Sequence, residues 1–332
     1  MSTTEGEITT ALKKTLEAVK KFGQTDAKSV AKETGRKYGR ESSYLNKLTR
    51  MGFLVKQRVG RQTLFSVKPV ELTILKLGGS AITKKDRVLT ANLKAIQRLS
   101  LEISNALKFE KGPKRLVIVV GAGSFGHPLA LRYGIGSTAS PIETKEKVYG
   151  LAALKHALIQ LMSIVVEELL QKGVPAFPID PQHGIYQLTG EIDIGLLASL
   201  LNIGFVPVVC GATLIDSQKN VRIIGPDRTV YDLATRLNPS TVLFALDVDG
   251  VYTSYPFEDA ELIEKLTIED LEKLLLRPPK HIDVTGGMHA KIMEGFRMLR
   301  LGIDVILLNG LKPQLVEKAL CGEKVRGTYI MS

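Results

Sequence analysis

The stretch LTILKLGGSAITKK, Leu72 to Lys85, decides how the chain is interpreted. Its apolar run from Leu72 to Leu77 is typical of a buried strand, and the glycine pair that ends it leaves backbone N–H groups without Cβ atoms around them. Lys76 lies near the strand end, and Lys84 and Lys85 follow the turn. The stretch predicts a phosphate cradle, although an ordinary strand and turn would have a similar composition.

A second stretch repeats this transition. The apolar run Leu116 to Val120 breaks into GAGSFGH, Gly121 to His127. Because the carboxyl ends of parallel strands meet at one edge of a sheet, we expect the two glycine-rich loops to share one anionic pocket. Two such loops imply two bound phosphates.

The composition is that of a folded protein with two domains or one large α/β unit, since 332 residues are 44% hydrophobic. No apolar run is expected to reach the roughly 18 to 20 residues of a membrane span, and the N-terminus lacks the pattern of a signal peptide. We expect a cytoplasmic protein without a membrane partner. Cys210 and Cys321 have no His or Cys near them in sequence at metal-ligand spacing. This predicts reduced structural thiols and no protein-bound metal.

The net charge of +11 is concentrated near the N-terminus. Residues 1–68 contain 15 Lys and Arg against 6 Asp and Glu, which gives +9, whereas the remaining 30 and 28 give only +2. This asymmetry indicates an appended module with an anionic partner.

Residues 7–68 show the periodicity of a small helical domain. The pattern predicts three short helices over 7–22, 25–35 and 42–53, followed by a basic hairpin around Gly60. Around the third helix Arg40, which precedes it, and Asn46, Lys47 and Arg50, which lie on it, are expected to project outward.

This order of elements resembles a winged helix-turn-helix domain. The resemblance implies nucleic-acid contacts through the outer face of the third helix and through the hairpin, at Lys47, Arg50, Lys56, Arg58 and Arg61. The alternative is a solubilising or dimerising appendage whose lysines are only solvated, because a fold does not fix a function.

After Pro69 the chain alternates between β-type and helical patterns. Strands are predicted at 72–77, 116–120, 174–178, 206–209, 242–245 and 305–308, with helices at 90–107 and 145–171. This alternation predicts a mostly parallel sheet with helices on both faces, so that residues 1–68 and 69–332 form two domains.

Two late motifs complete the predicted pocket. In ALDVDGVYTSYP, 245–256, a strand ends at Asp247 and Asp249, whose carboxylates could bind a ribose hydroxyl or Mg²⁺. In DVTGGMHAKI, 283–292, paired glycines open a helix that carries Lys291 one turn later. A helix N-terminus next to a lysine is a suitable nucleotide-phosphate contact.

The motifs KLGGSAIT, GAGSFGH, DVDGVY and DVTGGM with Lys291, in this order, resemble the amino acid kinase superfamily over about Leu72 to Ile330. Within it, GAGSFGH and the sequence TKK at 83–85 most resemble the isopentenyl phosphate kinases. The resemblance implies a three-layer αβα fold and ATP-dependent phosphorylation of isopentenyl phosphate, with ATP and Mg²⁺ required and a homodimer as the usual assembly.

The resemblance also implies roles for individual residues. The first loop, with Lys76, Gly78, Gly79 and Ser80, would hold the ATP β- and γ-phosphates, and Lys85 would reach the phosphoryl group in transfer.

In the second loop, the backbone of Ala122 and Gly123 would contact acceptor and nucleotide, and His127 would grip the acceptor's phosphate. Asp247, Gly287 and Lys291 fall at nucleotide positions.

One segment departs from the family pattern. Where the family has a glycine followed by acidic residues, this chain has IIGPDRTVYD, which keeps Gly225, inserts Pro226 and offers Asp227. Proline removes a donor and stiffens a loop, so the acceptor contact of Gly225 and the ordering of the catalytic lysines by Asp227 become open questions.

The residue types agree with phosphoryl transfer between two anions. A phosphate acceptor carries its own nucleophile, so no general base is needed, and cations must offset the repulsion. Two alternatives remain: a kinase of this fold for another small phosphate, phosphonate or carboxylate, or a transcription regulator that uses the kinase fold as a ligand sensor.

Overall fold

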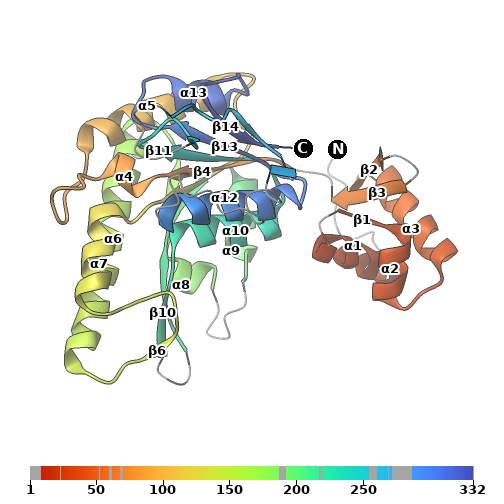
Figure 1. Cartoon of the computed structure of the whole chain (residues 1–332), viewed down its shortest axis with the longest axis horizontal. Helices are drawn as coiled ribbons and strands as arrows, with labels where there is room; N and C mark the ends of the chain where they lie inside the picture. The colour runs from red at the N-terminus through yellow and green to blue at the C-terminus, as the bar shows by residue number, and fades with distance from the viewer. Residues whose placement is uncertain are drawn as a thin grey trace.

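The computed structural model describes residues 9–22, 24–51, 53–59, 62–67, 70–186, 192–216, 218, 220–253, 260–267, 269–270 and 286–331. An α/β unit occupies most of the chain, and a small N-terminal unit precedes it (Figure 1).

The N-terminal unit consists of three helices and a small antiparallel sheet of order β1-β3-β2. Its elements are α1 (Thr10–Phe22), β1 (Gln24–Asp26), α2 (Ala27–Thr34), α3 (Tyr38–Arg50), β2 (Leu54–Val59) and β3 (Gln62–Val67). The expected helices and hairpin are present. Asp26 caps α2 by accepting hydrogen bonds from the N–H groups of Lys28 and Ser29, both at 2.8 Å, and Gly35 ends it in the left-handed region.

The third helix begins earlier than the apolar pattern predicted. Its first turn contains Glu41, whose buried carboxylate accepts hydrogen bonds from Thr15 (2.7 Å), Thr34 (2.9 Å) and Arg36 (2.9 Å). A buried acidic side chain anchors this turn, and hydrophobic periodicity cannot detect it. Strand β1 was not predicted, because it is short and pairs only with the distant β3.

The α/β unit is built on an eight-stranded sheet of order β12-β14-β13-β11-β4-β5-β8-β7. Apart from the antiparallel pair of β13 and β14, its strand pairs are parallel, as predicted. The strands are β4 (Val70–Leu77), β5 (Leu116–Val120), β7 (Ala176–Ile179), β8 (Val206–Cys210), β11 (Pro239–Leu246), β12 (Lys265–Leu266), β13 (Asp304–Asn309) and β14 (Gly327–Ile330).

Helices cover both faces of this sheet (Figure 1). One face packs against α5 (Leu93–Lys108), α7 (Lys145–Gln171) and α13 (Leu315–Leu320), and the other against α9 (Gly195–Ile203), α10 (Pro226–Leu237) and α12 (Gly286–Leu299). Side chains along β4 alternate between the two cores, with Leu75 and Leu77 on the α5 side and Ile74 on the α10 side. Lys76 therefore points toward α10.

Short elements complete the unit. They are α4 (Gly79–Ile82), α6 (Gly123–Arg132), α8 (Pro181–Gly184) and a small antiparallel sheet of β6 (Ser140–Pro141), β10 (Asn220–Ile224) and β9 (Ala212–Ile215). The small sheet was not predicted, since its strands have few residues. The two cysteines form no disulfide, and burial raises the pKa of the Cys210 thiol to about 12.

Helix α7 corrects the expectation about apolar segments. It contains an 18-residue window with a mean hydropathy of 1.5, long and apolar enough by composition to cross a membrane. In the fold, its residues Leu154, Leu161 and Val165 are buried in the core against α5 and the sheet. The expectation was wrong because a long core helix can be as apolar as a membrane span.

Candidate functional site

The candidate site lies where β4, β5 and β11 end side by side. The backbone N–H of Gly78 donates to the carbonyl of Ala245 (2.7 Å), and that of Gly121 donates to the carbonyl of Leu77 (2.8 Å). Strands β5, β8 and β7 lie on one side of β4 in the sheet. The next strand of this sheet along the chain, β11, lies on the other side of β4. Such a reversal of strand order at the carboxyl ends is the usual place for a ligand in an open α/β sheet.

A cavity of about 810 Å³ opens at this edge. It is lined by Lys76, Gly79, Ser80, Thr83, Lys85, Gly121, Ala122, Gly123, Ser124, His127, Pro128, Gly225, Pro226, Asp227, Leu246, Asp247, Val248, Met288 and Lys291. One space therefore gathers all the predicted catalytic residues and all the predicted acceptor residues. It also gathers the predicted nucleotide residues, except Gly78 and Gly287.

The two glycine loops meet backbone against backbone. A Cβ on Gly79 would lie 2.3 Å from the amide nitrogen of Gly123, and Gly123 itself has a φ of 47°. Only glycine tolerates both the close approach and the left-handed conformation. The glycines therefore allow the two loops to pack closely, and they also leave the amide groups uncovered, as the sequence predicted.

Lys76 and Lys291 share the carboxylate of Asp227. The ammonium of Lys76 lies 3.0 Å from Oδ1, and that of Lys291 lies 3.2 Å from Oδ2. Burial lowers the pKa of Lys76, with a further contribution from Lys291, although Asp227 opposes both. Burial alone would raise the pKa of Asp227, but the two ammonium groups outweigh it and hold that pKa below its ordinary value.

The proline that departs from the family pattern causes no disruption here. Pro226 stands in the first turn of α10, with Gly225 as the residue before the helix. A missing N–H costs nothing at that position, and the fixed φ of proline suits a helix start. The segment is thus a strand-to-helix transition, not a stiffened loop, and it directs Asp227 toward the lysines.

Asp247 makes a second set of polar contacts, with Ser80 and Lys85 of the first loop. Its carboxylate accepts a hydrogen bond from Ser80 Oγ (2.7 Å) and lies 2.5 Å from the ammonium of Lys85. Partial burial acts to raise the pKa of Asp247, but the contacts with Lys85 and Ser80 lower it overall. Lys85 is 71% exposed, so its ammonium stands at the open side of the cavity.

His127 and Ala122 belong to the segment around α6 and line the same cavity as Lys76. The imidazole of His127 and the buried ammonium of Lys76 therefore face one shared cavity. The exposed position of His127 leaves its ring accessible to a ligand.

Asp249, considered as a ligand for ribose or Mg²⁺, is held by other side chains. Its carboxylate accepts hydrogen bonds from Asn309, Lys312 and Arg326, at 2.9, 2.9 and 2.8 Å. Burial alone would raise its pKa, but these contacts lower it to about 2. Asp249 is absent from the cavity wall, so it fixes the segment that follows Asp247.

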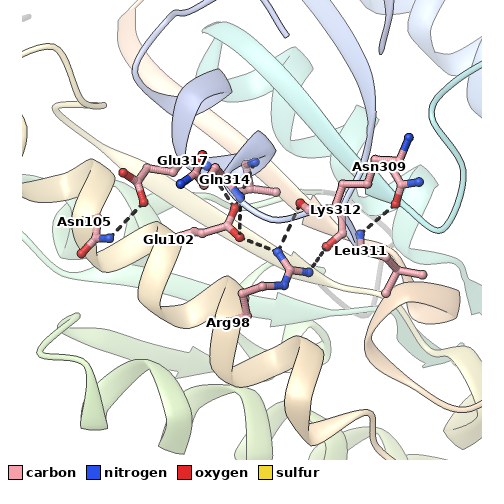
Figure 2. Close-up of polar contacts among 10 residues, drawn as sticks. Arg98, Glu102, Asn105, Asn309, Leu311, Lys312, Gln314 and Glu317 are labelled. Atoms are coloured by element: carbon pink, nitrogen blue, oxygen red, sulfur yellow. Dashed lines mark hydrogen bonds and ion pairs between the residues drawn. The ribbon is translucent and has the colours of Figure 1, made fainter. Parts of the chain in front are cut away.

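Figure 2 shows how the segment that carries Asn309 and Lys312 is itself anchored. The Glu102 carboxylate on α5 accepts hydrogen bonds from the backbone N–H groups of Gln314 (3.1 Å) and Val316 (3.2 Å), and it pairs with Arg98. None of this network was predicted, because the contacts of Glu102 with Gln314 and Val316 join residues more than 200 positions apart in sequence.

Several predicted residues do not line the cavity. Gly78 lies at the base of the first loop, and Gly287 is in the first turn of α12. Lys47 and Arg50 are exposed on α3 and Arg58 is exposed on β2, all in the N-terminal unit, while Arg61 lies outside the described residues.

Seven cavity residues were given no individual role from the sequence: Thr83, Gly121, Ser124, Pro128, Leu246, Val248 and Met288. Their positions within or next to the sequence motifs were the signal that could have indicated a place in the cavity. Within the described ranges, no group of three His, Cys, Asp or Glu side chains is placed to hold a metal ion.

Comparison with known proteins agrees with this geometry. Residues 71–309 match the model of the amino acid kinase family. The chain belongs to the amino acid kinase family.

Within this family the chain is similar to isopentenyl phosphate kinases. It is 39% identical to the enzyme of Methanothermobacter thermautotrophicus over 78% of this chain and 98% of the relative. It is 33% identical to that of Methanocaldococcus jannaschii, with the same coverage. A solved structure of isopentenyl phosphate kinase is 36% identical and superposes with a TM-score of 0.65 over 78% of this chain and all of the other.

Proposed function

We propose that this amino acid kinase family member transfers the γ-phosphoryl group of ATP to isopentenyl phosphate and releases isopentenyl diphosphate and ADP. The observation that carries the proposal is the single cavity around which Lys76, Lys85, Lys291 and His127 are gathered. The isopentenyl phosphate kinases to which the chain is similar support the choice of acceptor.

In this proposal the cations supply the catalysis. An oxygen of the acceptor phosphate attacks the γ-phosphorus, and the bond to the β,γ-bridging oxygen breaks, leaving ADP. No side chain has to remove a proton from the acceptor. Lys76, Lys85 and Lys291 stabilise the charge on the transferred group, together with the open amides of the glycine loops.

Asp227 orders two of these cations. Without an anion between them, Lys76 and Lys291 would repel each other in a region where Lys76 is almost fully buried. The carboxylate keeps both ammonium groups in place and leaves their remaining N–H donors for phosphate oxygens.

His127 is assigned to the acceptor end. The N–H of an imidazole can donate a hydrogen bond to a phosphate oxygen. Gly225, whose position before α10 leaves open space around its Cα, is assigned to the same end.

Mg²⁺ is proposed to arrive with the nucleotide. The carboxylates on the cavity wall, Asp227 and Asp247, are already paired with lysines, so they do not form a cation site of their own. Mg²⁺ in such enzymes is held largely by phosphate oxygens and neutralises part of their charge.

The test is ATP turnover by the purified protein with isopentenyl phosphate and with a panel of other small phosphates, phosphonates and carboxylates. We expect the highest kcat/KM with isopentenyl phosphate. Preference for another acceptor would favour the alternative kinase, and ligand binding without turnover with any acceptor would favour the sensor hypothesis.

We also propose that residues 1–68 form a winged helix domain with a nucleic-acid partner. Its acidic side chains are largely engaged elsewhere: Glu17 pairs with Lys20 and Glu33 with Lys21, while Glu41 is buried. On the exposed face of α3, Arg40, Lys47 and Arg50 follow at spacings that place them on one side of the helix.

The hairpin extends this basic surface with Lys56 and Arg58, both exposed. A surface of this charge suits the phosphates of a duplex. The boundary between the domains at residue 68, a homodimeric assembly and a cytoplasmic location all stay predictions.

A further inference from the structure

We propose that Thr83 is a positioning residue for phosphoryl transfer, because its hydroxyl joins the two glycine loops. The inference rests on the proposed kinase function and assigns a role to a side chain that the sequence left without one.

The hydroxyl of Thr83 makes one hydrogen bond to each loop. It donates to the carbonyl oxygen of Gly79 in the first loop (2.7 Å) and accepts from the backbone N–H of Ser124 in the second (3.0 Å). Thr83 is only 3% exposed, so water does not compete for either contact. A hydroxyl can donate and accept at once, whereas a methyl group of the same size can do neither.

The same contact fixes the space available to the second loop. A Cβ on Gly123 would lie 2.2 Å from Thr83 Oγ1, so the hydroxyl packs directly against the glycine backbone. Thr83 therefore sets the separation of the two loops together with the direct backbone contact between Gly79 and Gly123. We expect the separation of the two phosphate positions to depend on it, because the loops provide the amides that surround them.

Ser124 extends this connection to the segment that carries Lys85. Its carbonyl accepts from the N–H of Leu89 (3.1 Å), and its hydroxyl donates to the carbonyl of Thr90 (3.3 Å). The N–H of Lys84 donates to the same carbonyl of Thr90 (2.9 Å), which closes the segment between residues 84 and 90. A shift of Ser124 would therefore also move Lys85.

The experiment compares Thr83→Val with Thr83→Ser in the full-length protein. Valine keeps the shape and loses both hydrogen bonds, leaving the N–H of Ser124 buried without its partner. We expect kcat to fall roughly 10- to 100-fold in Thr83→Val and to stay within about threefold of wild type in Thr83→Ser. Rescue by serine separates the hydroxyl's role from a general effect of altered packing.

Thr235→Val is the matched control. Thr235 lies on α10, and its hydroxyl donates to the carbonyl of Asp232 within the same helix (2.8 Å). We expect wild-type kinetics from it. Thermal unfolding of each variant, followed by circular dichroism, establishes that the kinetics are measured on folded protein.

Affinity for ATP, measured by calorimetry without acceptor, keeps this inference distinct from the choice of substrate. We expect weaker ATP binding in Thr83→Val than in Thr83→Ser, even if isopentenyl phosphate proves to be the wrong acceptor. Wild-type kinetics and ATP affinity in Thr83→Val, or equal losses in the valine and serine variants, would overturn the proposal.

Discussion

The carboxylate of Asp227 lies 3.0 Å from the ammonium of Lys76, although the two residues are about 150 positions apart in sequence. Strand β4 brings Lys76 to the end of the sheet on the α10 side, and the first turn of α10 brings Asp227 to meet it. The pair, completed by Lys291, is the most buried group of charges in the cavity.

Replacing Asp227 by Asn should slow transfer. Asparagine keeps the shape but leaves Lys76 and Lys291 without an anion between them, so kcat is expected to fall roughly 10- to 100-fold. Steady-state kinetics with saturating ATP and acceptor measure it. Asp216→Asn, an exposed carboxylate in a turn distant in sequence from the loops, is the control. Unchanged kcat in Asp227→Asn would contradict the role of this carboxylate.

Replacing His127 by Ala should weaken acceptor use far more than ATP use. A charge-assisted hydrogen bond to phosphate is worth about 1.5–3 kcal/mol, so kcat/KM for the acceptor is expected to fall about 10- to 150-fold, with KM for ATP within about threefold. His156→Ala, at an exposed histidine on α7, is the matched control. Equal effects of His127→Ala on both substrates would argue against the assignment.

Asp249 should make stability depend on pH in the acid range. Its pKa of about 2 in the folded protein is below the ordinary value of 3.8, so its stabilisation is fully present above pH 3.8 and is lost as the pH falls toward 2. We expect Asp249→Asn to lower the free energy of unfolding by on the order of 2 kcal/mol at pH 7, and by progressively less below pH 4.

Urea unfolding at pH 7, 5, 4 and 3 measures this difference. Asp86→Asn, at a carboxylate whose side chain is 76% exposed, controls for the loss of one negative charge. A difference between wild type and Asp249→Asn that stays constant over this pH range would show that the contacts with Lys312 and Arg326 do not control stability.

Removing residues 1–68 should leave kinase activity within about threefold of the full chain. All cavity residues lie within residues 71–309, the part matched by the family model. ATP turnover measures the activity of the truncated protein, and circular dichroism shows whether it is folded. A folded but inactive truncation would indicate that the two units are coupled, for example through the hydrogen bond from the Asn238 side chain to the carbonyl of Val67 (3.2 Å).

Charge reversal on α3 should weaken binding to duplex DNA. For Lys47→Glu with Arg50→Glu we expect at least tenfold lower affinity for a labelled mixed-sequence duplex, and a salt dependence reduced by about two counterions. Fluorescence anisotropy at several salt concentrations measures both. Lys13→Glu with Lys14→Glu makes the same change of charge on the exposed side of α1 and is the control. Equal losses in the two double variants would point to a nonspecific charge effect.

The sequence by itself determined the parts of this protein that depend on local pattern. Apolar runs that end in glycine predicted β4 and β5 and placed Lys76 near the end of the first strand, and charge counting separated the basic N-terminal segment. The motifs in their order also indicated the family. These features are encoded within a few residues, so periodicity and composition suffice to detect them.

Only the tertiary structure decided how distant segments meet. It showed that Pro226 begins a helix and that Asp227 lies between two lysines. It also showed that Asp249 binds Lys312 and Arg326. The hydroxyl of Thr83 contacts both glycine loops. Each of these contacts depends on the packing of helices against a sheet, and local propensity does not specify which side chains that packing brings together.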